Sequence, residues 1–272
     1  MWWHHPGLHR EVVVEAARRL VTEERLGSVV TVVAGVDIGT KAVIDFADGY
    51  VAGEMPADIA DAVLADSREL AEHEQSRTLG YGEREVFIET VAPQPQMLIF
   101  GSDEVAQPLT KMAHELGFRV VVTDPRPAFT TPERFPDAAE VLVGWPDAVK
   151  DKITIDRRSY VVLLSHSPRF EDPVLQFVVG SPARYIGAMG SRRTHAKRLD
   201  KLREEGWSQE EVDRIHGPVG LDIGAETPAE VAVSILAEVV QARYGFGSGE
   251  SLRGQEGRIH MSRDGGQDSS GG

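Results

Sequence analysis

The chain of 272 residues contains no cysteine. This absence excludes disulfides, thiolate metal ligands, persulfide carriage and thiol nucleophiles. The sequence also has no run of 18 or more apolar residues, and residues 1–10 lack the hydrophobic core of a signal peptide. We therefore expect a cytoplasmic protein without a membrane-spanning segment.

Positive charge is scarce, with 29 Lys and Arg against 43 Asp and Glu and a formal net charge of −14. Binding to nucleic acid needs a basic face, so this balance argues against a nucleic-acid partner. An anion site would have to be a local concentration of Arg and Lys. The length favours two domains of unequal size, and the 41% hydrophobic content is that of an ordinary globular protein.

Residues 1–92 predict a smaller α+β domain. Apolar residues at helical spacing indicate helices over residues 10–25 and 58–74, and β-branched runs indicate strands over 28–34, 42–46 and 84–91. His4, His5 and His9 are interpreted as a solvated terminus, so no metal site is predicted. Pro93 and Pro95 interrupt regular structure and mark the domain boundary.

Residues 96–244 predict a Rossmann-like α/β domain. Short runs rich in Val, Leu and Ile alternate with helices or long loops, as in a parallel sheet covered on both faces. The predicted strands span residues 97–100, 118–123, 139–143, 159–164 and 184–189, with a helix over 104–115.

Two helix starts carry a capping box, Ser208-Gln-Glu-Glu211 and Thr227-Pro-Ala-Glu230. The helix from Pro228 to about Arg243 is apolar on most sides, so we expect it to be packed deeply between the sheet and another element. Residues 245–272 are rich in Gly, Ser and charge and are expected to form a disordered tail.

The first strand-to-helix turn of the second domain has a damaged phosphate loop. A dinucleotide fold uses G-x-G-x-x-G/A here, because glycines let the backbone approach the pyrophosphate at the helix N-terminus. This chain has Gly101-Ser102-Asp103-Glu104-Val105-Ala106, with Asp103 in place of the middle glycine. Its carboxylate would oppose a pyrophosphate, or it would cap the following helix.

Asp124 ends the next strand 23 residues after Gly101. This spacing is close to that of the acidic residue that binds an adenine ribose, and Arg126 could instead favour a 2′-phosphate. Alternatively, Asp124 is a turn residue that closes the strand before Pro125.

A second anion site is predicted where Tyr185-Ile-Gly-Ala-Met-Gly190 runs into Ser191-Arg192-Arg193. Free amides at a helix start, a serine cap and two arginines suit a phosphate or a carboxylate. Alternatively, the arginines pair with Glu204, Glu205 or a neighbouring protomer.

Two further loops are candidates. Asp222, Gly224 and Glu226 lie in a glycine-containing loop that allows close approach of a ligand, although a tight structural turn would use the same residues. His166 follows a predicted parallel strand, where it is a candidate general acid or base or a solvated loop histidine.

Two segments, Tyr185-Ile-Gly-Ala-Met-Gly-Ser-Arg-Arg193 and the sequence from Gly217 to Glu238, closely resemble the C-terminal Rossmann domain of the XdhC/CoxI family of xanthine dehydrogenase accessory proteins. Val122-Thr-Asp-Pro-Arg126 and Glu133-Arg-Phe-Pro136 fit the same pattern. The resemblance covers about Met97 to Arg243.

The resemblance implies a homodimeric protein that binds the molybdenum cofactor (molybdopterin), assists its sulfuration and inserts it into a xanthine dehydrogenase-like molybdenum hydroxylase. It also implies a cysteine desulfurase as a partner. The cofactor-binding candidates are Gly101, Ser102, Asp103, Asp124, Arg126, Gly190, Ser191, Arg192, Arg193, Asp222, Gly224 and Glu226.

The chain departs from the family at positions that would carry chemistry. Gly101-Ser-Asp-Glu104 replaces Gly-x-Gly-His, and Gly53-Glu-Met-Pro56 stands where the family has Ser-Gly-Gly-Cys. The family's Ser-Ser-Pro-Arg loop is here Ala34-Gly-Val-Asp-Ile-Gly-Thr-Lys41, and its Thr-His-Asp is Ser165-His166-Ser167. Without the cysteine, the chain cannot relay sulfur on its own thiol.

Three hypotheses follow. The first, which we favour, is an accessory protein that is a cofactor carrier rather than an enzyme. The second is an NAD(P)-dependent oxidoreductase with His166 as proton carrier, although hydride transfer needs a properly seated dinucleotide. The third is a binding-only paralogue that has lost its ligand.

Overall fold

The computed structural model describes residues 6–165, 167–245 and 247–254. The chain divides into two compact units. The main segment of the first unit ends at Pro93, and Gln94–Glu250 forms the second unit. Among the described residues, 251–254 group with the first unit. His4, His5 and most of the predicted tail lie outside the described residues, while Leu252–Gly254 form a short 3₁₀ turn, η2.

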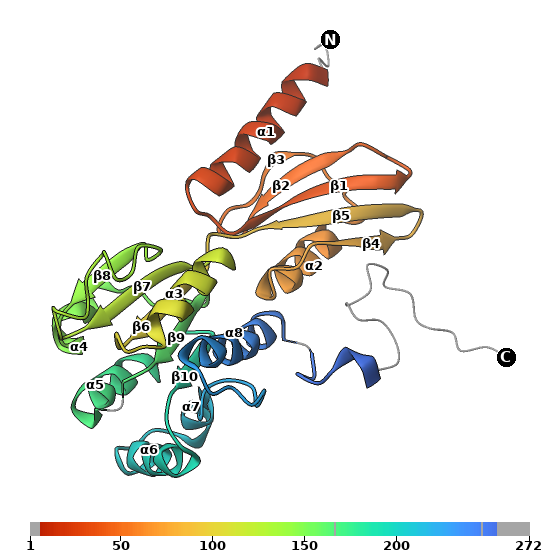
Figure 1. Cartoon of the computed structure of the whole chain (residues 1–272). Coiled ribbons are helices and arrows are strands. Elements are labelled where there is room, and N and C mark those ends of the chain that lie inside the picture. The colour runs from red at the N-terminus through yellow and green to blue at the C-terminus, as the bar shows by residue number, and fades with distance from the viewer. Residues whose placement is uncertain (1–5, 166, 246, 255–272) are drawn as a thin grey trace. The chain divides into compact units, whose positions relative to one another are not determined.

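The first unit is an antiparallel sheet with two helices. Its strand order is β3-β2-β1-β5-β4, and all of these pairs are antiparallel (Figure 1). The elements are α1 (Pro6–Thr22), β1 (Gly27–Gly35), β2 (Lys41–Asp45), β3 (Gly49–Gly53), α2 (Ala60–Glu72), β4 (Arg77–Tyr81) and β5 (Arg84–Val91).

This sheet is covered on both faces. Successive side chains of a strand point to opposite faces, and in β2 Ile44 belongs to the core that includes Val63 of α2. Val43 instead joins Leu20 of α1. The two helices therefore bury opposite faces of the sheet.

The second unit is a parallel sheet with helices on both faces. Its elements are β6 (Gln96–Phe100), α3 (Ala106–Glu115), β7 (Arg119–Asp124), β8 (Glu140–Val143), α4 (Pro146–Val149), η1 (Lys150–Lys152), β9 (Ser159–Leu163), α5 (Pro168–Val178), β10 (Tyr185–Ala188), α6 (Arg192–Glu204), α7 (Gln209–Asp213), β11 (Ile215–His216) and α8 (Pro228–Tyr244).

The strand order β11-β10-β9-β6-β7-β8 is that of the doubly wound dinucleotide fold, and every pair is parallel. Alternate residues of β6 reach the two cores: Leu98 packs with residues of α5 such as Val174, and Ile99 packs with residues of α3 and α8 such as Leu109 and Ile235. The predicted fold class, a Rossmann-like parallel-sheet domain preceded by a smaller α+β domain, is confirmed.

Some predicted elements differ in detail. The helix expected from residue 104 begins at Ala106, and the helix after Ser208 has only five residues. None of the helices in the described part of the chain is long and apolar enough to cross a membrane.

The prediction that α8 is buried on most sides is only partly correct. Ile235 and Val239 are fully buried, but Val233 is 46% exposed and Val240 is 36% exposed. The helix is an outer layer that packs on the sheet and on α3, so only one of its faces is covered.

Thr227 and Glu230 form the capping box that begins α8. The Thr227 hydroxyl accepts a hydrogen bond from the Glu230 amide, and the Glu230 carboxylate accepts one from the Thr227 amide at 2.8 Å. We predict that Thr227→Ala lowers the free energy of unfolding by about 1 kcal/mol, because it removes one acceptor from the helix start. Thr227→Ser keeps the hydroxyl and should stay near wild type. Urea unfolding of both variants tests this, and equal stabilities would contradict it.

Candidate functional site

The first βα turn, between β6 and α3, approaches a neighbouring loop closely. Gly101 has φ +120°, and a Cβ at this position would lie 3.0 Å from the Ser165 amide nitrogen. Its own amide donates to Thr123 O at 2.8 Å. Glycine is therefore required at this position, as in a dinucleotide fold.

The amides that follow Gly101 are used by the chain's own carboxylates. Asp103 Oδ1 accepts hydrogen bonds from the Val105 amide at 3.1 Å and the Ala106 amide at 3.3 Å. The Ser102 amide donates to Asp124 Oδ2 at 2.9 Å. An incoming pyrophosphate would meet carboxylates where it needs free N–H groups.

Asp124 and Arg126 form a bidentate ion pair. Arg126 Nε lies 2.8 Å from Asp124 Oδ1, Arg126 Nη2 lies 2.7 Å from Oδ2, and the Arg126 amide also donates to Oδ1. With the Ser102 amide, the two oxygens accept four hydrogen bonds. The carboxylate is therefore already satisfied and needs no ribose hydroxyl.

This pairing sets the protonation of Asp124. Burial would raise the pKa of its carboxyl, but hydrogen bonds from Arg126 and Ser102 outweigh burial and hold the pKa below its usual value. Asp124 is therefore ionised at neutral pH.

A pocket of about 580 Å³ lies beside this turn, where strand order reverses between β6 and β9. Its lining includes Asp103, Asp124, Arg126 and the rings of Trp145 and Phe170. His166 lies outside the described residues, between the lining residues Ser165 and Ser167.

The turn between β10 and α6 is organised differently. Gly190 has φ +144°, and Ser191 caps α6 by accepting from the Thr194 amide at 3.1 Å. Within the described chain, the amides of Arg192 and Arg193 have no hydrogen-bond partner. This helix start keeps free N–H groups for an anion.

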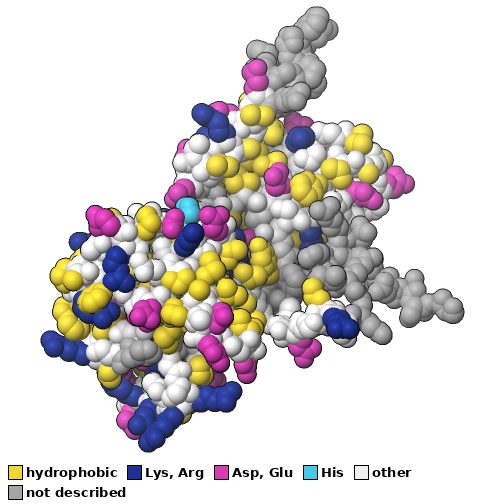
Figure 2. Space-filling view, in the orientation of Figure 1, with side chains coloured by type: hydrophobic (Ala, Val, Ile, Leu, Met, Phe, Trp, Pro, Cys, Tyr) yellow, Lys and Arg dark blue, Asp and Glu magenta, His cyan; other side chains and the backbone are white. Residues whose placement is uncertain are grey.

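The two arginines are exposed and form no ion pair with any described residue, Glu204 and Glu205 included. Figure 2 shows Lys and Arg side chains gathered at the end of the second unit where Figure 1 places α6. These arginines are therefore available to an external anion.

A pocket of about 730 Å³ joins this helix start to the loop before α8. Its lining includes Gly190, Ser191, Arg192 and the loop residues Gly220, Asp222 and Gly224. We call it the anion pocket. The pocket thus brings together the helix start at Ser191 and the loop containing Asp222, which the sequence indicated as separate candidates. Glu226 and Arg193, which were also candidates, are not part of the lining.

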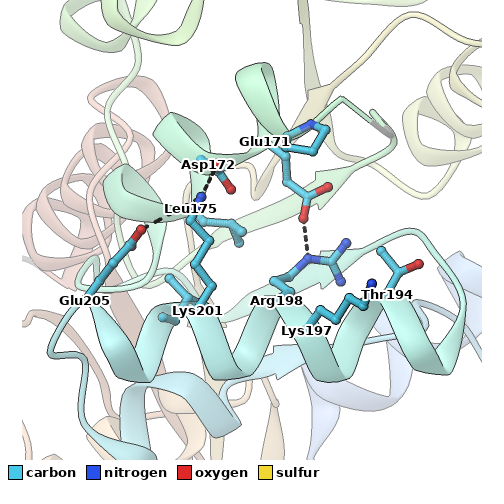
Figure 3. A pocket seen from close by; sticks show the side chains of 10 residues that line it. Glu171, Asp172, Leu175, Thr194, Lys197, Arg198, Lys201 and Glu205 are labelled. Carbon is cyan, nitrogen blue, oxygen red and sulfur yellow. Dashed lines mark hydrogen bonds and ion pairs between the residues drawn. The ribbon is translucent and has the colours of Figure 1, made fainter.

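Arg198, nearly two turns further along α6, is buried and already paired (Figure 3). It forms an ion pair with Glu171 of α5, and its Nη2 donates to Met189 O at 2.9 Å. Lys201 pairs in the same cleft with Asp172. The two ion pairs hold α6 against α5. The hydrogen bond from Arg198 to Met189 O also fixes the turn between β10 and α6.

His195 lies against Arg198 and the backbone of Gly217. Its Nδ1 is 3.3 Å from Arg198 Nη1, so this nitrogen acts as an acceptor. Burial, Arg198 and His216 all lower the pKa of His195. The ring is therefore neutral at pH 7.

Sequence reasoning missed Arg198 and Glu238. Arg198 stands in a strongly basic helix, where nothing distinguishes the buried arginine from the exposed ones. Glu238 was detectable as the one carboxylate in the apolar interior of α8, because Glu230 belongs to its first turn. In the described residues, no group of three or more His, Asp or Glu is arranged to hold a metal ion.

Arg126→Ala should lower the free energy of unfolding at pH 7 by about 1–3 kcal/mol, because it leaves a buried carboxylate with fewer partners. The folded pKa of Asp124 lies below its unfolded value of about 3.9. Its contribution is complete above that value and is lost as pH falls through the folded pKa. The difference between variant and wild type should therefore shrink in urea unfolding below about pH 4.

Arg119→Ala is the matched control, because Arg119 pairs with Glu140 on the surface. It should cost at most about 1 kcal/mol. A loss equal to that of Arg126→Ala would contradict a special role for the buried pair.

Residues 97–239, slightly more than half of the chain, match the family described as the XdhC Rossmann domain. A protein of Bacillus subtilis (strain 168) named as a probable xanthine dehydrogenase subunit is 32% identical over 158 residues, which are 58% of this chain and 46% of that protein. The "Molybdenum cofactor insertion chaperone PaoD" of Escherichia coli (strain K12) is 34% identical over 151 residues, 56% of this chain and 41% of that protein.

The fold is similar to the crystal structure of a xanthine dehydrogenase from Bacillus halodurans, with a TM-score of 0.63 and 25% sequence identity. That match covers 86% of this chain and 65% of the other. The chain spans less than half the length of the two curated relatives. The strand order of the second unit is that of a Rossmann domain, and residues 97–239 match the XdhC Rossmann domain. The chain therefore belongs to the XdhC family.

Proposed function

We propose that this protein is an accessory protein that holds the molybdenum cofactor by its phosphate and presents it to a xanthine dehydrogenase-like molybdenum hydroxylase. One observation carries the proposal: in the anion pocket, the free α6 helix start and the unpaired Arg192 face the loop of Gly220 and Asp222. In a chain with net charge −14, such an uncompensated cation is suited to an anionic ligand.

The donor set fits the phosphate end of the cofactor. The free amides of Arg192 and Arg193 and the Arg192 guanidinium can bind phosphate oxygens. The volume of about 730 Å³ is in the range of small-molecule sites, about 300–1,000 Å³. The Asp222 carboxylate and loop backbone offer polar groups to a pterin.

When bound, the cofactor supplies a molybdenum centre for redox chemistry on the hydroxylase. The residues of this chain bind the phosphate and orient the pterin. No cysteine is present to ligate the metal or carry sulfur, so sulfur would come from a separate protein such as a cysteine desulfurase. The family resemblance adds a homodimer in the cytoplasm to the proposal.

The names of the relatives support this role. One is called a molybdenum cofactor insertion chaperone, and another is named as part of a probable xanthine dehydrogenase. The first βα turn supports it less directly, because Asp103 and Asp124 occupy the amides that an NAD(P) pyrophosphate would need. The geometry thus favours a carrier over a dinucleotide-dependent oxidoreductase.

The function is tested by mixing the protein with molybdenum cofactor and recording the visible absorption spectrum, alongside thermal-shift scans with NAD and NADP. We expect the absorption of the cofactor to remain with the protein after gel filtration. We expect neither NAD nor NADP to raise the melting temperature. Stabilisation by NADP alone would instead support the oxidoreductase. No response to any ligand would support a binding-only paralogue.

The combined substitution Arg192→Ala and Arg193→Ala should weaken cofactor binding by about tenfold or more, because charge-assisted hydrogen bonds contribute about 1.5–3 kcal/mol each. Equilibrium titration followed by absorption measures this. Lys150→Ala with Lys152→Ala removes the same charge from η1, away from the anion pocket, and should leave binding unchanged. If both double variants lose the same affinity for the cofactor, the effect depends only on the net charge of the protein. That result would contradict the assigned site.

A further inference from the structure

Glu238 is a carboxylate on the apolar helix α8, and it receives hydrogen bonds from three separate segments. Tyr185 OH of β10 donates to its Oε2 at 2.5 Å, and the Gly220 amide donates to the same oxygen at 2.8 Å. His216 Nδ1 of β11 lies 3.1 Å from Oε1. The side chain is only 16% exposed, so these donors replace water.

Gly220 is the point where this cluster reaches the anion pocket. Its φ is +103°, and a Cβ there would lie 2.3 Å from Ser234 Oγ of α8. The loop backbone therefore runs directly against the helix. Gly220 and Leu221 also line the pocket, so their position sets the shape of one wall.

Ser234, one turn before Glu238 on the same face of α8, holds the next loop residue. Its hydroxyl donates to Leu221 O at 2.5 Å, and its carbonyl accepts from the Leu221 amide at 3.1 Å. Val219 on the other side donates its amide to Ala188 O of β10 at 3.2 Å. Successive residues of the loop are thus fixed to α8 and β10.

The electrostatics keep Glu238 as an acceptor. Burial would raise the pKa of Glu238, but hydrogen bonds from His216, Tyr185 and Gly220 hold it below its usual value. Burial and the nearby Glu238 charge raise the pKa of Tyr185, so the phenol keeps its proton and donates. The carboxylate and its donors stabilise one another.

We propose that Glu238 is the positioning residue of the anion pocket: it accepts the Gly220 amide and thereby fixes the loop opposite the Arg192 helix start in the arrangement that binds phosphate. This rests on the proposed function for the identity of the site. Glu238 acts through the loop, because it is not itself part of the pocket lining.

Two substitutions distinguish the role of Glu238 as a hydrogen-bond acceptor from its role in filling space in the core. Glu238→Met keeps an unbranched chain of similar length but has no strong acceptor, so the Gly220 amide and Tyr185 hydroxyl lose their partner. Glu238→Gln keeps one carbonyl oxygen for both donors and can donate its amide to His216 Nδ1. A space-filling role is satisfied by both variants, whereas a positioning role is satisfied only by Gln.

The experiment measures two quantities on the full chain. Hydrogen exchange reports protection of the Gly220 and Leu221 amides without ligand, and calorimetric titration with inorganic phosphate reports affinity. In Glu238→Met we expect exchange at Gly220 to be at least about tenfold faster and phosphate binding about tenfold weaker. Glu238→Gln should recover most of both. Glu204→Gln, an exposed change of the same charge on α6, should match wild type.

Ser234→Ala is the second variant, should Glu238→Met fail to fold. It removes the hydroxyl bond to Leu221 O. Because Ser234 also lines the pocket, exchange is the deciding measurement for this variant, and it should be faster by a smaller factor than in Glu238→Met. Wild-type exchange and affinity in the Met or Ala variant would overturn the proposal, as would a Gln variant as impaired as Met. If wild type binds no phosphate, the proposed function fails, while exchange at Gly220 still decides the role of Glu238.

Discussion

The second unit depends on the amide groups at the carboxyl edge of its parallel sheet, each of which needs an acceptor where a strand turns into a helix. The first turn meets this need internally, through Asp103 and Asp124. The turn before α6 caps only the Thr194 amide, and the amides of Arg192 and Arg193 find no acceptor among residues 6–165, 167–245 and 247–254. One fold thus carries a closed and an open anion position on the same edge.

Buried side chains support the segments around the open position at the start of α6 through an ion pair and hydrogen bonds. Arg198 ties the β10–α6 turn to α5, and Glu238 ties the loop after β11 to α8. Both groups are buried and fully engaged, so neither competes for the ligand. Under the proposed function, recognition of the ligand falls to Arg192 and the amides at the start of α6.

Sequence patterns predicted the parallel sheet because continuous apolar strands and capped helices are local features. They missed β3 and β4, whose glycines interrupt the alternation of apolar residues, and the two-residue strand β11, which is too short to show a period. They located Asp103 and Asp124 but could not choose between ligand and structural roles, because that choice depends on which amides each carboxylate reaches. The partners of Arg198 and Glu238 are distant in sequence and needed the fold.

The closed first turn also has a consequence for competition inside a cell. A ligand stabilises or displaces only in proportion to its concentration relative to its dissociation constant. An intact glycine-rich turn would bind a dinucleotide in proportion to the dinucleotide concentration. Under the proposed function, the carboxylates that fill this position make the occupancy of the anion pocket independent of the dinucleotide concentration.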